Sequence, residues 1–152
     1  MSSDGSVTPD DIDAIAAWTV VRAARELARR LGEDLAHLDL TPVEFGALVQ
    51  LAAADHLSQA DLARAVGIRP QSTATLVAAL GTRGLVERGA APGRGRASRL
   101  HLTPAGRELL AAAWPIAQAS NAWFPDGGTA VAAALRPFTS GNATAEGADG
   151  VA

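Results

Sequence analysis

The chain has 152 residues, no cysteine and a formal net charge of −3. This length suits one domain with room for a dimerisation extension, and the lack of cysteine excludes disulfides, thiolate metal sites and thiol-based redox sensing. The acidic N-terminus does not resemble a signal peptide and no apolar run reaches the ~20 residues of a membrane span, so we expect a cytoplasmic protein with no membrane partner.

The first predicted helix runs from Pro9 to the mid-30s, after an N-terminus that we expect to be disordered (residues 1–8). Thr8 offers a hydroxyl N-cap, and proline suits the first helical position. The apolar residues of this helix cover more than one face, which indicates packing on two sides, as in a dimer. A second helix is predicted over residues 42–54, where Thr41 and Pro42 repeat the same start signal.

Residues 59–66 and 70–84 are predicted to form two helices joined by a tight turn. Ser58 is the predicted N-cap of the first of them, and Gly67 permits the positive φ that such a turn needs. Small Ala63 lets the two helices cross closely, which is the pattern of a helix–turn–helix. A second helix held in this way presents its N-terminal residues to the major groove of DNA.

Two short strands, residues 85–88 and 99–102, are predicted next, with a glycine- and arginine-rich tip between them at residues 89–96. A long helix is then expected from Pro104 to about Phe124, with a kink at Pro115. A last short helix over residues 129–138 precedes a tail that we expect to be disordered.

Positive charge is concentrated in residues 64–107, which we call the basic segment. It carries eight arginines and one acidic residue, Glu87, although the whole chain is acidic. Such a segment in an acidic protein indicates a surface for a polyanion. The helix–turn–helix pattern overlaps it, so the polyanion is predicted to be double-stranded DNA, with Gln71 suited to adenine, Arg69 to guanine and Thr75 to a thymine methyl group.

The sequence resembles the MarR (multiple antibiotic resistance regulator) family over residues 40 to about 124. The resemblance is carried by LSQADLA (57–63), GIRPQS (67–72), Leu80, RGLV (83–86) and LHLTPAGR (100–107), which have the family's order and spacing. It implies a mainly α fold: a winged helix–turn–helix with a small β-hairpin wing, and N- and C-terminal helices that form a homodimerisation region. It also implies a repressor that binds a pseudo-palindromic operator and is released by a small, often aromatic, ligand.

Two positions depart from the family pattern. The wing commonly carries Asp-x-Arg; Arg96 fits its arginine, but Arg94 stands where the acid is expected. Thr75 stands where an arginine is frequent, so base readout is expected to depend on Arg69 and Gln71. The expected organisation is a disordered N-terminus (1–8), a dimerisation helix (9–40), a DNA-binding lobe (41–102), C-terminal dimerisation helices (103–139) and a disordered tail (140–152).

The resemblance and the residue pattern together give three candidate groups. The DNA-contacting candidates are Ser58, Arg69, Pro70, Gln71, Ser72, Thr73, Thr75, Arg83, Arg88, Arg94, Arg96 and Arg99. The candidates for an effector pocket are Trp18, His37, Phe45 and Trp114, and those for dimerisation are Ile12, Ile15, Trp123, Phe124 and Leu135. For the aromatic residues, ordinary core packing is the simpler interpretation.

Two other classes of function compete with the repressor. One is a winged-helix protein-interaction module without sequence-specific DNA binding, which the acidic total charge and the altered wing favour. The other is an enzyme, which is disfavoured because the sequence shows no Gly-x-Ser-x-Gly elbow, no cysteine nucleophile and no metal-ligand cluster. We therefore predict no catalytic residue, no metal and no cofactor.

Overall fold

The computed structural model describes residues 5–89 and 98–139 and divides the chain into two compact units, residues 1–42 and 43–152. We describe each unit by itself. The first unit contains α1 (Pro9–Asp13), α2 (Ala16–Leu35) and a 3-10 turn, η1 (Ala36–Leu38). None of the described helices is both long enough and apolar enough to cross a membrane.

The prediction of one continuous N-terminal helix is wrong. Helices α1 and α2 are separated at Ile15, whose backbone is extended (φ −81°, ψ 93°). The polar groups at this break have partners, which makes the interruption tolerable. The Thr19 hydroxyl donates to the Asp13 carbonyl at 3.1 Å, and the Arg22 guanidinium pairs with the Asp13 carboxylate at 3.0 Å.

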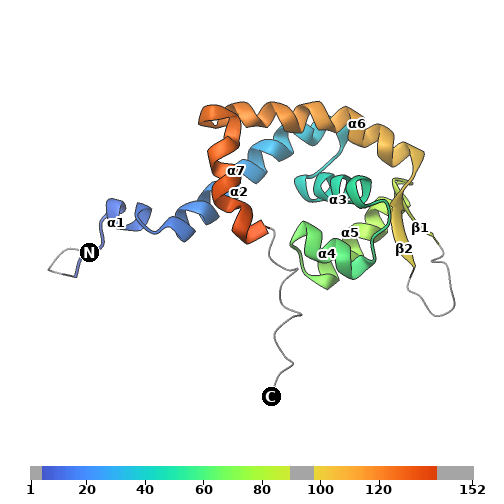
Figure 1. The fold of residues 1–152 in the computed structure, drawn as a ribbon, viewed down its shortest axis with the longest axis horizontal. Coiled ribbons are helices and arrows are strands. Elements are labelled where there is room, and N and C mark those ends of the chain that lie inside the picture. Colours follow the sequence, from blue (N-terminus) through green and yellow to red (C-terminus); the bar gives the residue numbers. More distant parts are fainter. Residues whose placement is uncertain (1–4, 90–97, 140–152) are drawn as a thin grey trace, which may run out of the picture. The chain divides into compact units, whose positions relative to one another are not determined.

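The second unit contains the other helices and both strands (Figure 1). Helix α3 lies beneath the long helix α6, α4 and α5 follow below α3, and the β1–β2 hairpin lies at the edge of the group. The element bounds are α3 (Pro42–Ala54), α4 (Gln59–Val66), α5 (Pro70–Thr82), β1 (Val86–Gly89), β2 (Arg99–Leu102), α6 (Pro104–Ala119), η2 (Ser120–Trp123), η3 (Pro125–Gly128) and α7 (Thr129–Thr139).

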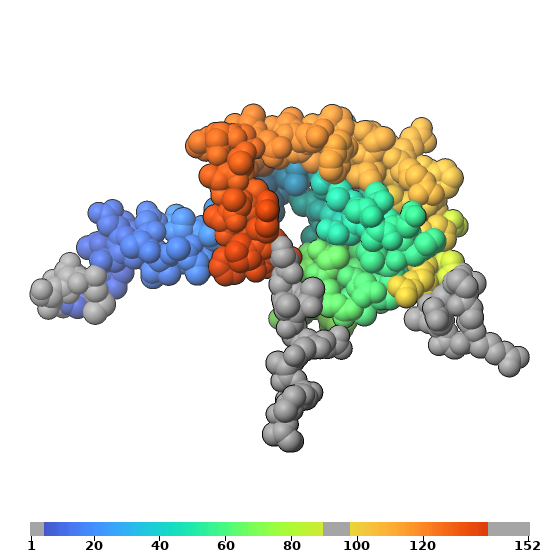
Figure 2. Space-filling view, viewed as in Figure 1, coloured from blue at the N-terminus to red at the C-terminus, as the bar shows by residue number. Residues whose placement is uncertain are grey.

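The core of this unit consists of leucines that α3, the helix–turn–helix and the hairpin contribute. The space-filling view shows α3 and α4 packed directly against each other, with α6 above α3 (Figure 2). Burying one such side chain stabilises the fold by about 2 kcal/mol, so this core sets the positions of α4 and α5. Its fully buried leucines are Leu48, Leu51, Leu62, Leu80, Leu100 and Leu102.

Three predicted N-caps are present. The hydroxyls of Thr8, Ser58 and Thr103 each accept a hydrogen bond from the backbone N–H three residues later, at 3.2, 3.0 and 3.0 Å. Each bond satisfies one of the N–H groups that a helix start leaves without an intrahelical partner. The starts of α1, α4 and α6 are thus set by local sequence.

The predicted hairpin is confirmed, with β1 one residue later than expected. Its antiparallel register pairs Val86 with Leu102 and Gly89 with Arg99. Leu57 extends the sheet by an isolated bridge to Leu100, with N···O distances of 2.7 and 3.2 Å. The hairpin is therefore tied to the turn that precedes α4.

Helix ends differ from the predicted ends. Helix α5 stops at Thr82, and the chain then turns at Gly84 in the left-handed region (φ 70°). Helix α6 continues through Pro115 but ends at Ala119, short of the predicted Phe124, because the chain tightens into η2. Helix α7 extends one residue beyond the prediction, to Thr139. The predicted tail, residues 140–152, lies wholly outside the described residues.

The foot of the hairpin and the start of α6 meet at Gly106. A Cβ atom there would lie 2.1 Å from the carbonyl oxygen of Leu85, so only glycine fits. The same carbonyl accepts from the Thr103 N–H at 3.1 Å, and the Thr103 hydroxyl donates to the Gly84 carbonyl at 2.6 Å. Helix α6 is thereby joined to the hairpin through backbone contacts.

Candidate nucleic-acid interface

Helices α4 and α5 form the predicted helix–turn–helix. Gly67 ends α4 in the left-handed conformation (φ 76°, ψ 33°), and its N–H bonds the Ala63 carbonyl at 2.9 Å. Arg69 is the extended N-cap residue of α5, and Pro70 takes the first helical position. Leu62 and Ala63 of α4 are buried, as are Leu76, Val77 and Leu80 of α5, so the turn is held from both sides.

The N-terminal end of α5 carries an exposed polar face. Arg69, Gln71, Ser72 and Thr75 are all exposed, as the sequence predicted, and Pro70 lies beside them. The side chain of Arg69 has no acidic partner within 4 Å among the residues that the structure describes. This face therefore offers donors, an amide and a methyl group that can meet base edges.

Thr73 does not belong to this face, which corrects its inclusion among the DNA-contacting candidates. Its side chain is fully buried, and its hydroxyl donates to the Arg69 carbonyl at 3.0 Å. Position 73 lies on the same helical stripe as Leu76, Val77 and Leu80, because residues three, four and seven apart share a face. Thr73 supports the first turn of α5 from inside.

The candidate arginines after α5 contact other side chains of the same lobe. Arg83 pairs with Glu44 at 3.4 Å. Arg88 donates to Gln59 at 2.6 Å and to Ser98 at 3.3 Å, so it links β1 to α4. Arg94 and Arg96, the predicted wing-tip arginines, lie outside the described residues.

Asp61 is a functional candidate that the sequence interpretation missed. Its carboxylate accepts from the Ser58 hydroxyl at 2.7 Å, pairs with Arg64, and lies 3.7 Å from Arg99. The hydrogen bond from Ser58 and the adjacent Arg64 guanidinium lower the pKa of this carboxyl below its ordinary value. The spacing of Asp61 and Arg64 is a helical ion-pair signal, but Arg99 could not be foreseen because it comes from the distant β2 strand.

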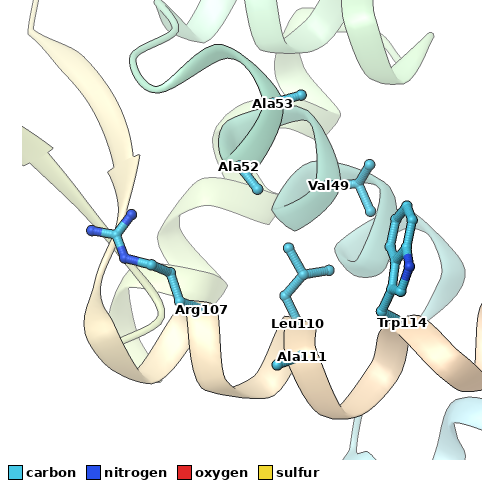
Figure 3. A pocket seen from close by; sticks show the side chains of 7 residues that line it. All are labelled: Val49, Ala52, Ala53, Arg107, Leu110, Ala111 and Trp114. Atoms are coloured by element: carbon cyan, nitrogen blue, oxygen red, sulfur yellow. The ribbon is translucent and has the colours of Figure 1, made fainter.

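An open apolar groove of about 600 Å³ lies between α3 and α6 (Figure 3). In the close-up, Leu110 and Trp114 reach from α6 toward Val49, and the Arg107 guanidinium stands at one end. Trp114 is 46% exposed. The complete lining is Val49, Ala52, Ala53, Arg107, Leu110, Ala111 and Trp114.

The groove brings together only one of the predicted effector residues, Trp114. Phe45 is half-buried on α3 but does not line it. Trp18 and His37 belong to the first unit, where the Arg25 guanidinium lies 5.9 Å from the centre of the Trp18 ring. Sequence reasoning missed Arg107 and Leu110, although residues 107, 110, 111 and 114 share one face of a helix.

The predicted dimerisation residues fall in both units. In the first unit Ile12 and Ile15 are exposed, and Ile15 keeps 56% of its surface accessible. In the second unit Trp123, Phe124 and Leu135 are half-buried. Phe138 at the end of α7 is 83% exposed and was not predicted.

No group of three potential ligands among residues 5–89 and 98–139 could hold a metal ion. The two histidines near the hairpin, His56 and His101, stack edge to face with ring centres 5.3 Å apart. The Nε2 atom of His101 lies 2.9 Å from the Glu87 carboxylate. This contact gives the Glu87 carboxylate a partner within the hairpin.

The sequence is similar to those of known proteins. The sequence model of the MarR family matches residues 38–97. An HTH-type transcriptional repressor of Mycobacterium tuberculosis is 33% identical over 110 residues, which are 72% of this chain and 79% of the repressor.

Solved structures match over most of the chain. The transcriptional repressor CouR bound to a 23-mer DNA duplex has a TM-score of 0.75 and 24% identity, covering 88% of this chain and 99% of that chain. CouR from Rhodococcus jostii RHA1 bound to p-coumaroyl-CoA has a TM-score of 0.74 and 22% identity, covering 84% and 94%. These likenesses confirm the predicted mainly α, winged helix–turn–helix fold.

Proposed function

This chain belongs to the MarR family of transcriptional regulators, and we propose that it is a homodimeric repressor that binds a specific DNA sequence. The observation that carries the proposal is the exposed polar face at the start of α5, held by the buried side of the helix–turn–helix. The bases would be read by Arg69 and Gln71, while Ser72, Arg88 and Arg99 would contact phosphates.

The dimer would place two copies of α5 in successive major grooves about one helical turn apart. Its contacts would come from residues 9–40 and 103–139, where Ile12, Ile15 and Phe138 expose apolar surface. A two-fold dimer recognises the same half-site twice, so the operator would be a pseudo-palindrome. We infer repression because the Mycobacterium tuberculosis relative and CouR are both transcriptional repressors.

Gln71→Ala should relax the base preference at one position in each half-site. An amide that pairs bidentately with adenine contributes about 1–3 kcal/mol of discrimination against the wrong base. Competition titrations against operators mutated one position at a time would measure this loss. Arg88→Ala serves as the comparison, because loss of a phosphate contact weakens binding to all sequences alike. A uniform loss for Gln71→Ala would contradict its role in base readout.

A protein-interaction module is the second candidate, and one observation favours it. Acidic side chains pair with several arginines of the basic segment, among them Arg64, Arg83 and Arg99, which lowers the positive charge offered to a partner. The two candidates differ in salt dependence. DNA binding through several phosphates makes log K fall linearly with log salt concentration, whereas no binding to any duplex at low salt would favour the interaction module.

The proposed effector site is the groove between α3 and α6. Trp114 offers an aromatic surface and Arg107, seven residues earlier on the same face, offers a cation roughly 10 Å along the helix. This pair suits an aromatic carboxylate. The CouR ligand p-coumaroyl-CoA shares the aromatic group, but its acyl carbon is a thioester and its anionic groups are phosphates. Helix α6 begins at the contact with Leu85, so a ligand that shifts α6 would move the hairpin. The ligand acts only if it favours that shifted state.

Titration with p-coumarate should change the tryptophan fluorescence in a saturable way. Trp114→Phe should abolish most of the change, although Trp18 and Trp123 remain. Arg107→Gln should weaken binding by roughly tenfold or more, since a charged hydrogen bond contributes about 1.5–3 kcal/mol. p-Coumaryl alcohol, which lacks the carboxylate, is the matched ligand. Equal binding of acid and alcohol would exclude Arg107 as the anchor.

A further inference from the structure

The arginines of the basic segment differ in their acidic partners. Asp61 serves two of them: Oδ1 pairs with Arg64, and Oδ2 lies 3.7 Å from Arg99 Nη1. Arg69 and Arg88, by contrast, have no carboxylate within 4 Å in the described part of the chain. Asp61, which lies three residues before the basic segment begins, thus pairs with one arginine of α4 and one of β2.

Asp61 is itself held in place. It is the third residue of α4, and its backbone N–H bonds the Ser58 hydroxyl at 3.0 Å while its carboxylate accepts from that hydroxyl at 2.7 Å. A carboxylate fixed in this way cannot follow an arginine that moves toward another anion. The hydrogen bond from Ser58 and the charge of Arg64 also keep the Asp61 pKa low, so the group stays ionised at neutral pH.

The two arginines remain accessible to solvent. The side chains of Arg64 and Arg99 are 54% and 44% exposed, and Asp61 itself is 38% exposed. Exposed ion pairs of this kind are weak, so a DNA phosphate can compete with the carboxylate for the same guanidinium groups. Asp61 therefore competes with DNA phosphates for both guanidinium groups.

We propose that Asp61 is a positioning residue that restrains Arg64 and Arg99 and thereby limits the affinity of the basic segment for DNA of unrelated sequence. This inference rests on the proposed DNA-binding function. Binding to unrelated DNA is almost entirely electrostatic, and each phosphate that a protein neutralises adds about 0.9 to the slope of log K against log salt concentration. An acid that holds two arginines would then suppress up to two such contacts.

The test compares Asp61→Asn with Glu87→Gln, using the full chain and a fluorescent 25-base-pair duplex of random sequence over a series of salt concentrations. Both variants remove one negative charge from the same lobe. Only Asp61→Asn releases arginines, because Glu87 contacts His101. We expect the Asp61→Asn slope to be steeper than that of the wild type by about 1–2, with affinity on the order of tenfold higher at 0.1 M salt. Glu87→Gln should leave the slope unchanged.

A double variant distinguishes the release of the arginines from any effect of Asp61→Asn on the N-terminal cap of α4. In an Arg99→Gln background, Asp61→Asn should steepen the slope by about 0.9 less than it does in the wild-type background, because only Arg64 is then released. Thermal unfolding of each variant shows whether α4 remains folded. Equal slopes for Asp61→Asn and Glu87→Gln, or weaker binding by a folded Asp61→Asn protein, would overturn the proposal. If the wild type binds the random duplex, the proposed DNA-binding function stands whatever the outcome for Asp61. If the wild type binds no duplex even at low salt, both the DNA-binding function and the Asp61 proposal are refuted.

Discussion

Replacing Gly106 by alanine should lower the free energy of unfolding by about 3 kcal/mol or more. The new Cβ would lie 2.1 Å from the Leu85 carbonyl oxygen and 3.1 Å from its carbonyl carbon, and neither atom can rotate away as a side chain would. The start of α6 must therefore separate from the hairpin. That movement would break the bonds of Thr103 to Gly84 and Leu85. Thermal unfolding should show a midpoint roughly 10 °C lower.

Gly46→Ala is the matched control. Gly46 also lies in a helix, but a Cβ atom there would meet only Val66 Cγ1, at the ordinary distance of 3.9 Å. Alanine is the better helix former by about 1 kcal/mol, so this variant should be as stable as the wild type or more so. If Gly106→Ala and Gly46→Ala had the same midpoint, the close approach of α6 to the hairpin would not exist in solution.

Replacing Gly67 by valine should destabilise the fold by about 1–3 kcal/mol and strongly weaken binding to the operator. Gly67 has φ 76°, a conformation that β-branched residues adopt very rarely. Nothing lies within 4 Å of a Cβ atom at this position, so the cost comes from the backbone alone. To relieve it, the turn must change, and Arg69 and α5 would then point in another direction. Chemical denaturation and operator titration measure the two effects.

Gly67→Asn separates conformation from size. Asparagine tolerates the left-handed region, so this variant should keep most of the stability and DNA affinity although its side chain is as large as valine's. If asparagine and valine were equally damaging, the left-handed turn would not explain the requirement for glycine at this position.

The helix–turn–helix and the hairpin could be predicted because their signals are local. Ser58 and Thr103 cap helices through contacts with residues three positions later. A glycine at position 67 itself indicates a turn with positive φ. The buried stripe of α5 is also a local signal, whereas the position of Thr73 near the helix start wrongly favours a DNA contact. Helical periodicity alone would have placed it inside.

Other features depend on contacts that spacing does not show. The break at Ile15 interrupts a sequence that otherwise favours a helix, and its stabilising bonds come from Thr19 and Arg22 further along the chain. The groove forms only where α3 and α6 come together. The sequence alone therefore does not show that Arg107 and Val49 line the same groove. The two arginines at Asp61 come from separate elements for the same reason.

The most direct test of the central claim is selection of duplex DNA from a random pool by the purified protein near physiological salt. We expect enrichment of an inverted repeat whose half-site centres lie about ten base pairs apart, because two copies of α5 would enter successive major grooves. Its half-sites should contain a position that the Gln71→Ala protein no longer selects. A folded dimer that enriches no sequence would contradict sequence-specific regulation and favour the protein-interaction module.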